Sequence, residues 1–151
     1  MDSNSHMKSA SSREVQQTSG EGGANAADHF IVKNGIEYSG THLLIDLWGA
    51  SHLTNQQLIE KTLRECVDKC NARLLHIHLH QFSDTGGVSG VAVLAESHIS
   101  VHTWPERGYA AFDVFMCGAS NPLLAVDILR NAFEAEKVNI EEILRGSSEG
   151  K

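Results

Sequence analysis

Apolar and polar residues follow recognisable periods along the chain, and these periods predict a series of strands and helices. The run 40–49 is apolar and bounded by two glycines, which predicts a strand. Apolar residues then recur at helical spacing from Leu58 to Cys70, which predicts a helix over 55–71 with Thr54 as its N-cap. Strict alternation between Leu75 and His80 predicts another strand with one polar face.

The second half of the chain consists mainly of short strands. Apolar runs between turn residues predict strands over 88–95, 98–103 and 109–116. Pro122 opens a predicted helix over 123–133, and residues 138–144 form either a last strand or a last helix. Clustered strands with two helices indicate the α+β class, as a two-layer sandwich with a mainly antiparallel sheet.

The first 28 residues differ from the rest because they are small and polar, with almost no large apolar side chains. Such a segment cannot bury enough surface to offset the entropy of ordering it. We therefore expect a disordered tail over 1–28 and a single domain over 29–151, with order beginning near Phe30 or Tyr38.

Charge and composition exclude several classes of protein. Lys and Arg number 12 and Asp and Glu number 19, which gives a net charge of −7 with neutral histidines. This balance argues against nucleic acid and against an anionic membrane surface as partners. No apolar stretch approaches the roughly 18 residues that a membrane span requires, and no secretory signal is evident. Three cysteines do not suggest a disulfide framework, so we expect a cytoplasmic protein with reduced thiols.

Reactive side chains are concentrated between residues 87 and 118. Ser97, His102 and Cys117 are candidates for a nucleophile, a base and a thiol. Because Ser97 and His102 are five residues apart, a regular strand would place them on opposite faces, and a bulge or turn would have to bring them together. The alternative interpretation is a set of polar residues at a strand edge.

The same stretch resembles a known family. Residues 96–118 resemble the signature of the prokaryotic S-adenosylmethionine decarboxylases, the small pyruvoyl-dependent type. Residues 40–46 resemble the opening strand of that family, and residues 87–90 resemble its second motif. The resemblance runs from about residue 38 to Gly146. It departs from the family at 119–122, where an acidic residue often follows the Cys-Gly pair.

The resemblance implies an enzyme that makes its own cofactor. It places the scissile bond between Glu96 and Ser97, so that the chain would be cut into a beta chain, 1–96, and an alpha chain, 97–151. Ser97 would become a covalent pyruvoyl group, which forms a Schiff base with the substrate and accepts the electrons left by CO2.

The family pattern also implies a role for five further residues. His102 would transfer protons during processing, and Ser89 would assist it. Cys117 would donate a proton to the substrate carbanion. Glu106 would hold the ribose hydroxyls, and Phe82 would stack on adenine. No metal is assigned.

The implied substrate is S-adenosylmethionine, and the product is the aminopropyl donor of spermidine biosynthesis. The implied assembly is a homodimer of processed protomers, each with helices on one face of its sheet, that forms a four-layer αββα arrangement with active sites near the interface. Two other functions remain open. One is a pyruvoyl-dependent arginine or ornithine decarboxylase. Glu106 and an aromatic platform argue against it, because they favour a nucleoside substrate. The other is a non-catalytic regulatory paralogue, which would have no chemical need for the reactive residues.

Two polar features outside these motifs have two interpretations each. His76, His78 and His80 alternate along one strand, as metal ligands can, but no partner motif accompanies them, which favours a polar strand face. Asp46 lies within an apolar strand and is either functional or a satisfied carboxylate.

Overall fold

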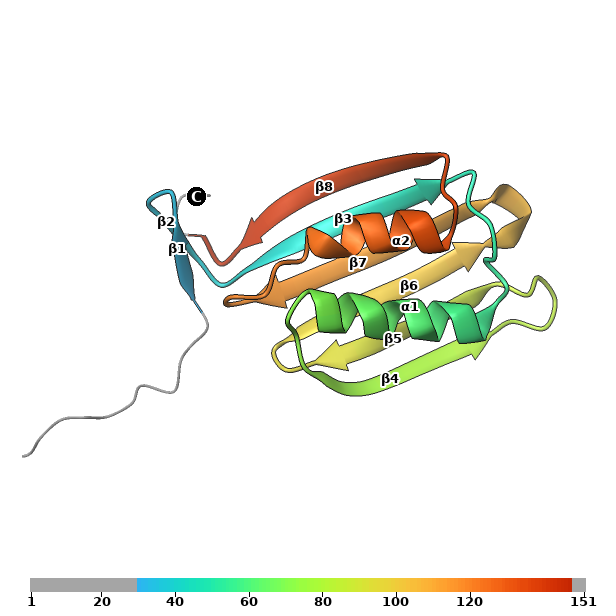
Figure 1. The fold of residues 1–151 in the computed structure, drawn as a ribbon, viewed down its shortest axis with the longest axis horizontal. Helices are drawn as coiled ribbons and strands as arrows, with labels where there is room; N and C mark the ends of the chain where they lie inside the picture. The colour runs from blue at the N-terminus through green and yellow to red at the C-terminus, as the bar shows by residue number, and fades with distance from the viewer. Residues whose placement is uncertain (1–29, 148–151) are drawn as a thin grey trace, which may run out of the picture.

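The fold is known from a computed structural model that describes residues 30–147, so the tail predicted over 1–28 lies outside the described residues. Six strands form one antiparallel sheet in the order β4-β5-β6-β7-β3-β8, and β1 and β2 form a separate hairpin (Figure 1). In chain order the elements are β1 Ile31–Lys33, β2 Ile36–Tyr38, β3 Gly40–Trp48, α1 Gln56–Lys69, β4 Leu74–Gln81, β5 Val88–Leu94, β6 Ser97–Trp104, the 3-10 helix η1 Pro105–Arg107, β7 Tyr109–Cys117, α2 Leu124–Ala132 and β8 Lys137–Arg145.

The structure confirms the predicted fold class and most of the predicted elements. The segment left open between strand and helix is the strand β8. The predicted N-cap was wrong by one residue, because Asn55 rather than Thr54 accepts the hydrogen bond from the Leu58 backbone N–H, at 3.0 Å. The β1–β2 hairpin was not predicted, although Asn34 and Gly35 both take the positive φ angles of a tight hairpin turn.

Both helices cover the same face of the six-stranded sheet (Figure 1). The apolar stripe of α1 that the spacing predicted packs there, and Cys66 and Cys70 are fully buried within it. Burial raises the pKa of the Cys70 thiol to about 11 and also raises that of Cys66, so these thiols are core residues. The core is centred on inward-facing residues of the strands beneath the helices, among them Leu43, Ile45, Ile99, Val101, Phe112 and Val114.

The other face of the sheet, called here the open face, is not covered by either helix. Side chains alternate along each strand, so the pairing register determines which residues stand together on it. One row runs from His80 through Ser89, His102 and Ala111 to Asp46. The open face therefore carries most of the polar chemistry of the domain.

Within residues 30–147, no helix is both long enough and apolar enough to cross a membrane.

Candidate active site

Ser97 begins β6 directly after the tight turn that follows β5. Its side chain is buried, and its Oγ accepts a hydrogen bond from the Cys117 backbone N–H at 3.1 Å. The Cys117 thiol in turn donates to the carbonyl oxygen of Glu96 at 3.0 Å. One residue of the neighbouring strand β7 thus contacts both the serine oxygen and the carbonyl before it. Glu96, Ser97 and Cys117 are called the cleavage group below.

The backbone before Ser97 has an unfavourable conformation. Leu94 pairs with Ser97, so only two residues join β5 to β6, and Glu96 takes a φ of 58°. Such short hairpin loops need positive φ angles, which a residue with a side chain adopts at a cost of about 1–2 kcal/mol. The peptide bond that the family pattern marks for cleavage therefore follows a strained residue.

The Cys117 thiol is kept in its protonated form by its surroundings. Burial raises its pKa, the hydrogen bond with Ser97 lowers it, and the nearby Glu96 carboxylate raises it, with the net shift upward. A thiol with an ordinary pKa of about 8.5 is already mostly protonated at neutral pH. The environment of Cys117 therefore favours the protonated thiol further.

Ser89 and His102 form a second pair on the open face. They are register partners on β5 and β6, and Ser89 Oγ lies 2.9 Å from His102 Nδ1. The His102 ring also lies 6.2 Å from the Trp104 ring, measured between centroids. Ser89 and His102 are called the Ser–His pair below.

The structure does not bring the Ser–His pair to the cleavage group of the same chain. Strand β6 keeps one continuous register with both neighbours, without the bulge that contact between Ser97 and His102 would need. Five residues of strand at about 3.3 Å each separate the two Cα atoms by roughly 16 Å. The predicted site residues therefore fall into two groups at opposite ends of the sheet.

The two predicted nucleoside-binding residues lie at the Ser–His end. Glu106 is in η1, immediately after the end of β6. Phe82 follows the end of β4, and its ring is half-exposed and edge-on to His80 at 4.8 Å. Its backbone N–H donates to the Gly87 carbonyl at 2.8 Å, which closes the loop before β5.

Sequence reasoning missed a polar network near the cleavage group. Asp113 binds His42 Nε2 at 3.1 Å and accepts from Ser100 Oγ at 3.0 Å. Arg145 Nη1 lies 3.3 Å from His42 Nδ1. The His98 ring lies 6.0 Å from that of His42, and burial, followed by the His42 charge, lowers the pKa of His98. Period-2 alternation placed these residues on one face, but only the register placed them side by side.

An aromatic stack was missed in the same way. Tyr109 stacks between Trp48 and Trp104, with centroid distances of 4.4 and 5.1 Å. Its hydroxyl donates to Asp46 Oδ1 at 2.7 Å, so Asp46 is a satisfied carboxylate. Burial and this contact with Asp46 raise the pKa of Tyr109 to about 12.

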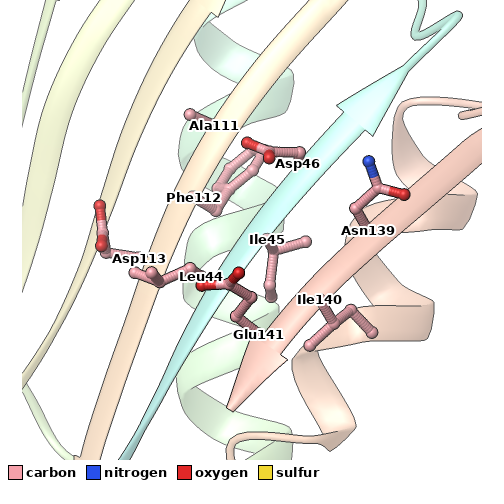
Figure 2. Close-up of a pocket in the computed structure, with 9 residues that line it drawn as sticks. All are labelled: Leu44, Ile45, Asp46, Ala111, Phe112, Asp113, Asn139, Ile140 and Glu141. Atoms are coloured by element: carbon pink, nitrogen blue, oxygen red, sulfur yellow. The ribbon is translucent and has the colours of Figure 1, made fainter. Parts of the chain in front are cut away.

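A shallow pocket lies between β7, β3 and β8 on the open face, and Asp46, Asp113 and Glu141 are among the residues that line it (Figure 2). Two of these carboxylates already bind the neighbours described above. Among residues 30–147, no cluster of three or more histidine, cysteine or acidic side chains is arranged to hold a metal ion. The imidazole row on β4 stands on the exposed polar face, next to Val91, Val93 and Ser89.

Comparisons with known proteins identify relatives over nearly the whole described region. Residues 41–146 match the family model described as S-adenosylmethionine decarboxylase. Proteins named S-adenosylmethionine decarboxylase proenzyme are 47% identical over 115 residues in Methanococcus aeolicus and 41% identical over 108 residues in Thermomicrobium roseum. These alignments cover 74% and 71% of this chain and 97% and 93% of the relatives. The crystal structure of the adenosylmethionine decarboxylase from Aquifex aeolicus matches with a TM-score of 0.64 and 31% identity, over 76% of this chain and 96% of that one.

Proposed function

The chain belongs to the S-adenosylmethionine decarboxylase family, and we propose that it cuts itself between Glu96 and Ser97 and then decarboxylates S-adenosylmethionine to the aminopropyl donor for spermidine biosynthesis. It is a carboxy-lyase by its family and its relatives. The observation that carries the self-cleavage is the pair of hydrogen bonds by which Cys117 contacts Ser97 Oγ and the Glu96 carbonyl.

Self-cleavage begins with an acyl shift within the cleavage group. Ser97 Oγ attacks the carbonyl carbon of Glu96, its proton passes to the amide nitrogen, and the amide becomes an ester. The Cys117 thiol donates to the carbonyl oxygen on which negative charge develops, as a donor in an oxyanion hole does. Relief of the strained Glu96 backbone favours the same direction.

Elimination completes the cleavage. A base removes the Ser97 α-proton, and the bond between Ser97 Cβ and Oγ breaks. The main-chain carboxylate of Glu96, released from the ester, becomes the C-terminus of 1–96. The dehydroalanine left at residue 97 hydrolyses with release of ammonia and becomes the pyruvoyl group. The residues present fit this group, because a buried serine at residue 97 lies beside a protonated thiol.

If the Ser–His pair supplies the base for these steps, it has to be the pair of a second copy. The Ser–His pair lies roughly 16 Å along β6 from Ser97 of its own chain, too far for proton transfer. A second copy packed on the open face would bring its own Ser–His pair to this cleavage group if the two-fold axis runs across the strands. We therefore propose a homodimer with four layers, αββα, in which each active site contains residues of both copies.

The roles in turnover follow from the same arrangement. The pyruvoyl group supplies a covalent carbonyl for the substrate amine and an electron sink for decarboxylation. Cys117 donates its thiol proton to the substrate carbon that has lost CO2. Glu106 accepts hydrogen bonds from the ribose hydroxyls, and Phe82 stacks on the adenine. Both of these come from the copy that supplies the Ser–His pair, since they share its end of the sheet.

Intact mass under denaturing conditions tests the cleavage and the substrate together. We expect fragments 1–96 and 97–151, with the second blocked and gaining substrate mass when S-adenosylmethionine and cyanoborohydride are added. Fragments that trap arginine or ornithine instead would contradict the proposed substrate. An uncleaved chain that stays intact on incubation would contradict the proposed enzyme.

Co-expression of two variants tests the shared site. Ser97→Ala and His102→Ala should each stay uncut alone, because the first lacks the nucleophile and the second the base. Co-expressed, they should form mixed dimers in which the His102→Ala chain is cut, up to about half of that chain in the arithmetic of random pairing. No cleavage in a mixed dimer shown to form would refute the contribution of a second copy.

A further inference from the structure

Histidines are concentrated on the open face. The chain has nine histidines, of which His6 and His29 lie outside the described residues and His52 lies in the loop before α1. The remaining six stand on the open face, as the register and ring contacts place them: His42, His76, His78, His80, His98 and His102. Since histidine is the side chain that gains charge between about pH 5 and pH 8, the charge of this face depends on pH.

The three strands at this end of the sheet, β4, β5 and β6, contain no acidic residue to balance that charge. The open-face residues of β5 beside His76 and His78 are Val93 and Val91, and the next strand, β6, adds His98 and His102. The charged residues around the ends of β4 are Arg73 and Asp84, together with Glu96 in the β5–β6 turn, where the Ala95 N–H donates to the Arg73 carbonyl. The helix α1, which carries several charged residues, covers the other face of the sheet.

The open-face carboxylates belong to the other half of the sheet. Asp113, Asp46 and Glu141 lie on β7, β3 and β8, where His42 and Arg145 already accompany them. From β4 to β7 there are three strand spacings, about 14 Å, which is well beyond the roughly 4–6 Å within which a carboxylate favours the charged form of a neighbouring group. These carboxylates therefore do not neutralise imidazolium charge on β4.

The two-fold axis of the proposed dimer can be followed to β4 through the register. If the Ser–His pair of one copy meets the cleavage group of the other, the axis crosses β6 midway between Ser97 and His102, near Ile99. The residues paired with this point of β6 are Val91 and Ala92 on β5, and these in turn pair with His78 and Ile77 on β4. An axis across the strands also places β4 opposite β4, with packed sheets about 10 Å apart. His78 of each copy then stands next to its own symmetry mate, with His76 one position away on the same face.

From this placement we propose that the dimer interface is an acid-sensitive switch: protonation of His76 and His78 separates the two copies and so dismantles both active sites. The proposal rests on the proposed homodimer and concerns its regulation. Neutral imidazoles allow the two β4 strands to face each other. Imidazolium ions there repel each other across the axis, without a carboxylate on β4, β5 or β6 to offset them.

The size of the effect follows from proton linkage. Each proton taken up when the dimer separates raises the dissociation constant about tenfold per pH unit, over the interval between the pKa of the group in the monomer and its lower pKa in the dimer. Uptake of one proton per copy, two per dimer, therefore gives about a hundredfold increase per pH unit. Histidines that bind protons equally in monomer and dimer give no change.

Sedimentation velocity of the full chain at about pH 7.5 and about pH 5.5, with EDTA present, tests the switch across the range where histidine titrates. We expect a dimer that dissociates in acid, and a His76→Gln/His78→Gln variant that stays dimeric at both pH values. His52→Gln is the matched control, because His52 pairs with Glu134 away from the open face and should leave the acid dissociation intact. Circular dichroism at both pH values establishes that the monomers are folded.

Each outcome bears on one proposal. A wild-type monomer at the higher pH would overturn the homodimer itself. A dimer that is equally tight at both pH values, or a double glutamine variant that dissociates like the wild type, would overturn the switch and leave the homodimer standing. Lysine provides the converse test: His78→Lys, with a permanent charge, should be a folded monomer at the higher pH, and a stable dimer of this variant would overturn the switch.

Discussion

Removal of the Cys117 thiol should slow self-cleavage by a defined amount. In Cys117→Ala the backbone N–H still donates to Ser97 Oγ, so the nucleophile stays in place and only the 3.0 Å contact with the Glu96 carbonyl is lost. A net hydrogen bond contributes about 1–1.5 kcal/mol, and 1.4 kcal/mol corresponds to a factor of about ten in rate. We therefore expect Cys117→Ala to cleave about tenfold more slowly than the wild type, yet to go to completion.

A time course of freshly translated chain, read as the fraction of fragments 1–96 and 97–151 by mass, measures this rate. Cys117→Ser is the matched control, because its hydroxyl still donates to the carbonyl and should keep cleavage within about threefold of the wild type on the same scale. Both variants should then turn over poorly, since neither offers a thiol proton to the substrate carbon. Cleavage of Cys117→Ala at the wild-type rate would refute the thiol's part in cleavage, and sustained wild-type turnover would refute its role as donor.

Three further predictions concern pH and stability. The raised pKa of Cys117 keeps the thiol protonated at neutral pH, so turnover should fall in alkaline buffer as the thiol ionises, and a profile flat through the alkaline range would contradict the assigned donor. Tyr109→Phe removes the 2.7 Å hydrogen bond to Asp46 and should lower the free energy of unfolding by about 1–3 kcal/mol. Urea titration measures this loss, and an unchanged free energy of unfolding would contradict the prediction. Gly90→Ala would place a Cβ 2.3 Å from the His78 carbonyl oxygen, and a loss of about 1–3 kcal/mol in the same assay is expected, which an unchanged midpoint would contradict.

The elements of the fold were predictable because each depends on local periodicity. Alternation along β4 and the helical spacing of α1 are properties of neighbouring residues, and a glycine or proline directly follows β3, β6, β7 and β8. The β1–β2 hairpin was missed because three-residue strands are too short for a period to show. The last segment stayed ambiguous because β8 is an edge strand with little burial, which weakens its pattern.

The sequence by itself determined the identity of the reactive groups, the order of the elements and the family, because these depend on residue types at fixed spacing. It could not determine which groups meet. Ser97 and His102 are close in sequence yet lie at opposite ends of a regular strand, whereas Cys117, twenty residues after Ser97, contacts it across β6 and β7. Only the sheet register decides such contacts, because pairing between strands brings distant residues within bonding distance while an extended strand moves near neighbours apart.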